Sequence, residues 1–130
     1  MDSDVSAVER YLDCLAAHDW EGLATTIADH GFVRDGPFRD LVTGKAPYVA
    51  FLRGVVTSLK GHELTVQRVS HASDHVSYVE LTETVETDGV ATTYPECIVF
   101  KRDDTGLIRH VSVYIKQAGS NAPRSGGGAG

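Results

Sequence analysis

The N-terminal part of the chain carries apolar residues at intervals of three and four, the spacing of one side of an α-helix. On the first predicted helix these residues are Val5, Val8, Leu12 and Leu15. A second, short helix is expected to begin at Asp19 as N-cap and to bury Trp20. A third is expected to begin near Lys45-Ala46-Pro47, to carry Tyr48 and Phe51 on its apolar face and to end at Gly61. The pattern therefore predicts three helices.

From Glu63 onward the apolar period changes to two, which is typical of strands. Four segments are rich in Val, Thr, Ile and Tyr: "ELTVQRVSHA", "HVSYVELTETVET", "VATTYPECIVFKR" and "LIRHVSVYIKQ". The turns between them are short, and Asp88-Gly89 is a strong two-residue hairpin signal. Short turns require antiparallel neighbours, and Pro95 is expected at a bulge or an edge. Three helices followed by such a meander predict an α+β fold.

The end of the chain, "AGSNAPRSGGGAG", contains too few apolar groups to pack. We therefore expect one domain over residues 1–117 and a disordered Gly-rich tail over residues 118–130. In the domain, a curved antiparallel sheet wrapped around the three helices would form a cone with a cavity between the layers. Small-molecule sites tend to lie in such cavities.

Composition and charge exclude several classes of partner. The 130 residues carry a formal net charge of -6 with scattered basic residues, which argues against nucleic acid. No apolar stretch approaches the roughly 20 residues that span a bilayer, so no membrane partner is expected. The acidic N-terminus does not resemble a signal peptide, and Cys14 and Cys97 make no metal spacing. We expect a cytoplasmic protein without a metal site or a cofactor.

The stretch "FVRDGPFRD" at residues 32–40 leaves two interpretations open. Asp35 is either a solvated residue of a Gly-Pro turn or a carboxylate at the mouth of the cavity, where partial desolvation would raise its pKa. Asp40 is expected to remain at the surface of the turn. The choice between the two readings of Asp35 separates a catalytic site from a structural turn.

The last predicted strand has two different faces. One face carries Arg109, Val111, Val113 and Ile115, and the other carries Ile108, His110, Ser112 and Tyr114. We expect the polar and aromatic set to line the cavity, where His110 could exchange protons near neutral pH, although a structural histidine is the alternative. The Val-Val-Ile set would then lie outside and form a homodimer interface through the sheet.

The chain resembles the nuclear transport factor 2-like superfamily, and most closely its SnoaL-like and ketosteroid isomerase-like branch. The residues that carry the resemblance are "VERYLDCLAAHDWEGLATTIAD", "VRDGPF" and "DDTGLIRHVSVYI", and the likeness covers roughly residues 4–117. It implies the cone fold. The superfamily contains isomerases, cyclases, epoxide hydrolases, dehydratases and proteins without chemistry, so the resemblance alone does not assign an activity.

The resemblance also implies roles for single residues. Asp35 matches the aspartate that moves the proton in ketosteroid isomerases, although Gly36 separates it from the proline that follows. Tyr11 matches the tyrosine that donates a hydrogen bond to the oxyanion. The second donor is an acid two residues after a proline; that count lands on Cys97 here, and a shift of one residue gives Glu96. The epoxide hydrolases need an arginine flanked by two aspartates on strands around a water. Arg34 and Asp35 are adjacent and would point to opposite faces of a strand, and Arg68 has no aspartate two residues away, so no such triad is expected.

These observations predict binding of a small, largely apolar carbonyl compound in the cone. Proton transfer such as isomerisation or cyclisation is the expected chemistry if the protein is an enzyme, and a non-catalytic binding or dimerisation module is the alternative. Asp35 would abstract a proton beside the carbonyl, and the other polar groups would stabilise the enolate. The predicted catalytic residues are Asp35, Tyr11, His110 and Glu96, and the predicted ligand contacts are Trp20, Phe51, Ser112 and Tyr114.

Overall fold

The computed structural model describes residues 6–116. The predicted tail and Val5 lie outside this range. The helices are α1 (Ala7–Ala17), α2 (Trp20–Ala24) and α3 (Lys45–Ser58), and the strands are β1 (Val33–Asp35), β2 (Leu41–Thr43), β3 (Lys60–His71), β4 (Val76–Thr87), β5 (Val90–Arg102) and β6 (Ile108–Ile115). The three predicted helices and four predicted long strands are confirmed.

The helices begin where the sequence supplies caps. Ser6 and Glu9 form a capping box at the start of α1, and the side chain of Asp19 accepts a hydrogen bond from the Gly22 amide at the start of α2. Helix α3 ends at Ser58, three residues before the predicted stop at Gly61, and the chain enters β3 at Lys60.

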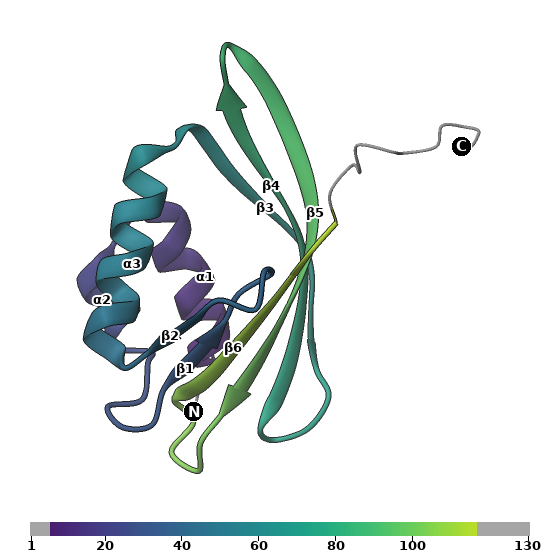
Figure 1. Cartoon of the computed structure of the whole chain (residues 1–130). Helices are drawn as coiled ribbons and strands as arrows, with labels where there is room; N and C mark the ends of the chain where they lie inside the picture. Colours follow the sequence, from purple (N-terminus) through teal and green to yellow (C-terminus); the bar gives the residue numbers. More distant parts are fainter. Residues whose placement is uncertain (1–5, 117–130) are drawn as a thin grey trace.

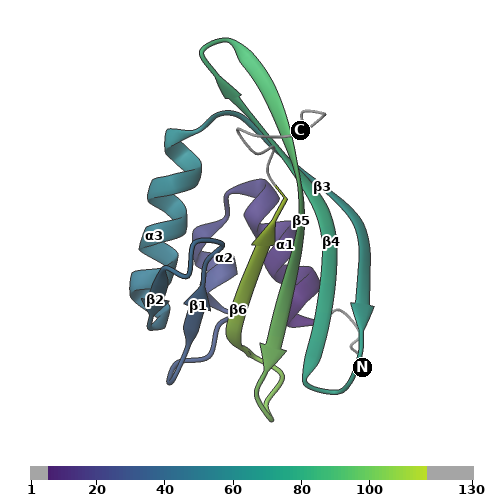
Figure 2. The ribbon, with the colours of Figure 1, turned by 45° about the vertical axis from the view of Figure 1, so that its right-hand side comes forward.

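The six strands form a single sheet in the order β2-β1-β6-β5-β4-β3. The long strands β3 to β6 pair antiparallel, as their short turns require. Strand β1, which was not among the four predicted strands, pairs parallel with β6. The segment that connects β1 to β6 contains β2, α3, β3, β4 and β5. Figure 2 shows β1 beside β6.

The helices all lie against one face of the curved sheet, which gives the α+β cone that the sequence predicts (Figure 1). The core lies between these layers, and its largest fully buried side chains are Tyr11, Tyr48, Phe32 and Phe100. The ring of Phe100 meets that of Tyr11 edge-on, with centroids 5.0 Å apart. Within residues 6–116, no helix has the length and apolar character needed to cross a membrane.

Pro95 lies at an edge of the ladder and not at a bulge. Its pairing with Thr82 on β4 continues the register of the neighbouring residues without interruption. Its carbonyl accepts a hydrogen bond from the Lys116 amide at 2.9 Å, and the β5–β6 pairing begins only at Glu96. The missing N–H of the proline therefore falls where β6 ends, so that no ladder hydrogen bond is lost.

Candidate active site

A cavity of about 300 Å³ lies between the helices and the inner face of the sheet. Most of its lining is apolar, as is usual for sites that hold small organic molecules. Strands β4, β5 and β6 supply every second residue to it, and α1 and α3 close it from the other side. The polar side chains of the lining are Tyr11, Arg34, Tyr48, Glu83, Tyr94 and Glu96.

Two carboxyl groups, Glu83 on β4 and Glu96 on β5, share this cavity. Glu83 stands opposite Tyr94 and Glu96 opposite Leu81, so the two acids are diagonal neighbours on one face of the hairpin. Burial, together with the hydrogen bond and negative charge of Glu83, raises the pKa of Glu96 to about 9. Glu96 is therefore a neutral acid near pH 7, able to donate a hydrogen bond.

Glu83 has the opposite protonation state. Burial raises the pKa of its carboxyl, but hydrogen bonds from Glu96 and His62 outweigh burial, and the pKa lies below its ordinary value. His62 Nε2 lies 2.6 Å from Glu83 Oε2, and the His62 side chain is only 4% exposed. An irregularity in the β3–β4 pairing between Lys60 and Glu63 accompanies this placement of His62. The site thus holds one ionised and one neutral carboxyl side by side.

Two tyrosines from different helices meet at the helical side of the cavity. The hydroxyls of Tyr11 on α1 and Tyr48 on α3 form a hydrogen bond, and both side chains are buried. Burial raises the pKa of Tyr48 to about 12, and burial and the neighbouring Tyr48 raise that of Tyr11 well above its ordinary value. Both phenols therefore stay protonated and are hydrogen-bond donors at neutral pH.

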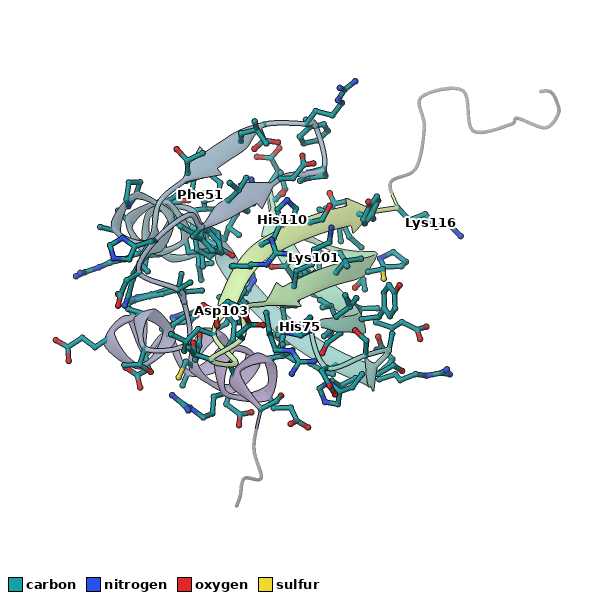
Figure 3. The ribbon with its side chains drawn as sticks, turned by 90° about the horizontal axis from the view of Figure 1, so that it is seen from below. Phe51, His75, Lys101, Asp103, His110 and Lys116 are labelled. Atoms are coloured by element: carbon teal, nitrogen blue, oxygen red, sulfur yellow. The ribbon has the colours of Figure 1, made fainter. Side chains whose placement is uncertain are left out.

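Arg34 on β1 brings a positive charge to the cavity. Its Nη1 donates to Asp40 Oδ2 at 2.8 Å, and its Cζ lies 4.7 Å from the centroid of the Phe51 ring. Phe51, one of the predicted ligand contacts, lines the cavity and belongs to α3, on the helical side of the molecule (Figure 3).

The structure corrects the expected position of Asp35. In the parallel pairing of β1 with β6, Arg34 stands opposite Val111 and Asp35 opposite Ser112. Partners in register point to the same face of a sheet, and Val111 is fully buried in the core. Arg34 therefore enters the cavity, and Asp35 lies on the outer face. Asp35 is separated from Tyr11 and Glu96, which do share the cavity.

The expected faces of the last strand are likewise reversed. Val113 and Ile115 line the cavity, while His110, Ser112 and Tyr114 line a shallow outer depression together with Asp35. Figure 3 shows His110 next to Lys101, its partner in the β5–β6 pairing. Burial and Lys101 lower the pKa of His110. The apolar residues proposed for a homodimer interface face inward, so the dimer stays a prediction without that support.

The other predicted site residues lie in different places: Glu96 is at the cavity, and Trp20 is on the helical surface. Glu96 faces the cavity, whereas Cys97 lines the outer depressions, which decides between the two positions after Pro95. Trp20 does not line the cavity; it stacks on His18 with centroids 5.7 Å apart, and it lines a groove along α2 and α3. In residues 6–116, no group of three or more His, Cys, Asp or Glu side chains is placed to hold a metal ion.

Sequence reasoning missed Glu83, His62, Tyr48 and Arg34 as site residues. A signal existed for Glu83, because it shares the alternation of Leu81 and Val85, which must face the core if the strand packs on helices. Tyr48 lies on the predicted apolar face of the third helix. The pairing of His62 with Glu83 across 21 residues had no local signal.

A SnoaL-like domain model matches residues 8–111. The chain belongs to the SnoaL-like family. No curated protein matches the sequence. Among solved structures, this SnoaL-like protein is similar to an LEH-like epoxide hydrolase from M. tuberculosis, with 23% identity and a TM-score of 0.71, over 85% of this chain and 80% of that one.

Two further structures have the same fold. A protein with a ketosteroid isomerase-like fold from Catenulispora acidiphila is 12% identical with a TM-score of 0.73, and 89% of each chain is covered. An NTF2-like protein of unknown function from Cytophaga hutchinsonii is 15% identical with a TM-score of 0.70, over 85% of this chain and 96% of that one. At these identities the likeness establishes the fold of the SnoaL-like protein and not its activity.

The raised pKa of Glu96 makes stability depend on pH. Its folded value of about 9 lies far above the ordinary 4.5, so the folded protein keeps a proton that the unfolded chain releases. This stabilisation is complete below about pH 4.5 and is lost as the pH rises toward 9. Because glutamine does not ionise, the melting temperature of Glu96→Gln should rise relative to wild type across this window in thermal melts. Exposed Glu86→Gln is the control, and a pH-independent difference for Glu96→Gln would contradict the assignment.

Proposed function

We propose that this SnoaL-like protein is an enzyme that transfers a proton on a small, largely apolar carbonyl compound. The observation that carries the proposal is the pair Glu83 and Glu96, whose pKa values are shifted in opposite directions within one apolar cavity. Carboxyl pairs with separated pKa values are typical of acid and base assignments in active sites.

In this proposal Glu83 is the general base. Its ionised carboxylate removes a proton from the carbon beside the substrate carbonyl, and the electron pair of the C–H bond moves to the carbonyl oxygen to give an enolate. His62, at 2.6 Å from Glu83 Oε2, orients the carboxylate. Return of the proton from Glu83 to a different carbon completes an isomerisation. In a cyclisation, the enolate carbon attacks a second carbonyl of the substrate, and the alkoxide that forms takes the proton back from Glu83.

Glu96 and Tyr11 are the proposed donors to the enolate oxygen. Both are protonated near pH 7 because burial raises their pKa values, and both line the same cavity. Glu83 accepts a hydrogen bond from the single proton of Glu96 in the resting site, and this proton turns to the enolate oxygen once Glu83 has taken the substrate proton. Donors held in place in a dry site stabilise developing charge strongly, because they need no reorganisation as the reaction proceeds. Tyr48 holds the Tyr11 hydroxyl through their hydrogen bond. Glu83 takes the role of base that was expected of Asp35, because Asp35 lies on the other face of the sheet.

The proposal is tested with β,γ-unsaturated ketones such as cyclohex-3-enone. Isomerisation to the conjugated ketone is followed by ultraviolet absorbance, and proton exchange at the α-carbon is followed by NMR in D₂O. We expect both to be accelerated by the wild-type protein. Tight binding of the ketones without exchange or isomerisation would favour the competing non-catalytic module. Cyclohexene oxide serves as a comparison substrate, and hydrolysis of this epoxide alone would overturn the proposed reaction class.

A further inference from the structure

The guanidinium group of Arg34 is fixed at the cavity and not free at the surface. Its side chain is only 12% exposed, and its Cζ atom lies over the Phe51 ring, 4.7 Å from the ring centroid. Arginine stacked on an aromatic ring loses little flexibility on binding a ligand, because its orientation is already set. Arg34 therefore differs from the exposed Arg39 of the same turn.

The turn that follows β1 is built around this arginine. Asp40 Oδ2 accepts from Arg34 Nη1 at 2.8 Å, and the Gly36 amide donates to the Asp40 carbonyl at 2.8 Å. A Cβ atom on Gly36 would lie 2.4 Å from Arg34 Nη1 and 2.4 Å from Asp40 Oδ1. A side chain at position 36 would therefore displace the ends of the Arg34–Asp40 ion pair.

Most donors of Arg34 remain available. A guanidinium carries five N–H groups, and within residues 6–116 the hydrogen bond to Asp40 uses Nη1. The charge acts inside the cavity, because it lowers the pKa values of Tyr11, Glu83 and Glu96 against the effect of burial. Asp40 cancels only part of this charge for a buried ligand, since the Asp40 side chain is 48% exposed and the Arg34 side chain is 12% exposed.

We propose that Arg34 forms a subsite for an acidic group of the ligand, so that the cavity takes small apolar carboxylic acids, and keto acids as substrates. The choice of keto acids rests on the proposed proton-transfer function; the subsite itself does not. A carboxylate can accept two parallel hydrogen bonds from one guanidinium, which favours arginine for this task. The net charge of -6 would repel anions elsewhere on the protein, so recognition of an acid needs a local cation such as Arg34.

The subsite is tested by equilibrium binding, without turnover. Isothermal titration calorimetry compares 3-phenylpropanoate with 3-phenylpropanamide, which has nearly the same shape and no charge. We expect the wild-type protein to bind the acid about tenfold more tightly than the amide, since hydrogen bonds between charged groups are stronger than neutral ones. Arg34→Met should abolish this preference, Arg34→Lys should keep part of it, and the matched control Arg39→Met should leave it unchanged.

Equal or weaker binding of the acid by the wild type, or a preference that survives in Arg34→Met, would overturn the proposal. If Arg34→Met does not fold, ¹⁵N NMR of the wild type decides: the Arg34 Nε resonance should shift with the acid and not with the amide, and an unmoved resonance counts against the subsite. A preference for acids in a protein without exchange activity would refute the proposed reaction and leave the subsite standing. Turnover of neutral ketones by a protein that does not prefer acids would support the proposed reaction and refute the subsite.

Discussion

Glu83→Gln should lower the rate of ketone isomerisation by about two orders of magnitude or more, the usual contribution of a general base. Glutamine keeps the shape of the side chain and can still meet His62, but it cannot accept the substrate proton. The loss should appear in kcat more than in KM, because the base acts in the transition state and contributes little to binding of the ketone. Steady-state kinetics by ultraviolet absorbance measures both constants.

The matched control for this variant is Glu80→Gln on the same strand. Glu80 is exposed and pairs with Arg68 across the surface at 3.3 Å, so its charge does not enter the cavity. Its replacement should change kcat by no more than a few fold. Wild-type-like turnover in Glu83→Gln, or an equal loss in both variants, would remove Glu83 from the mechanism.

Phe100→Ala should destabilise the protein by about 3–5 kcal/mol, the range for truncating a large buried aromatic side chain. Phe100 is completely buried on β5 and packs edge-on against Tyr11, so its removal leaves a cavity between the sheet and α1. The free energy of unfolding is measured by urea denaturation with circular dichroism. The loss is a large share of the stability of a typical single domain.

The control for this truncation is Phe38→Ala. Phe38 lies in the turn after β1 and is 74% exposed, so replacing it removes little buried apolar surface. It should change stability by less than about 0.5 kcal/mol, as surface substitutions usually do. A loss at Phe100 as small as that at Phe38 would contradict the packing of α1 on the sheet.

The elements of the fold were predictable because their signals are local. Ser6 and Asp19 are N-cap residues that indicate where two helices begin, and the two-residue turn at Asp88-Gly89 fixes the β4–β5 hairpin. The parallel pairing of β1 with β6 was not predictable in this way. The two strands are separated by more than seventy residues, and three residues of β1 carry too little pattern to choose a partner.

The candidate site was harder to predict because it depends on which face of each strand is inside. On β6 the rule that apolar residues face the core would have placed Val111 and Val113 correctly. The opposite face was expected inside, because the polar and aromatic side chains of His110, Ser112 and Tyr114 are of the kinds that line pockets. The face of the sheet on which Asp35 lies depends on the register in which β1 pairs with β6. Glu96 was identified only as one of two choices, and its pairing with Glu83 requires the register of two strands at once.

The short length of β1 also bears on how this cavity could change during evolution. A slip of one residue along β6 would exchange the faces of all three β1 side chains. A single-codon deletion before Val33 could therefore withdraw Arg34 and present the Asp35 carboxylate to the cavity, with every wall residue from β4 and β5 unchanged. Such a deletion would replace the positive charge of Arg34 at the cavity wall with the negative charge of Asp35.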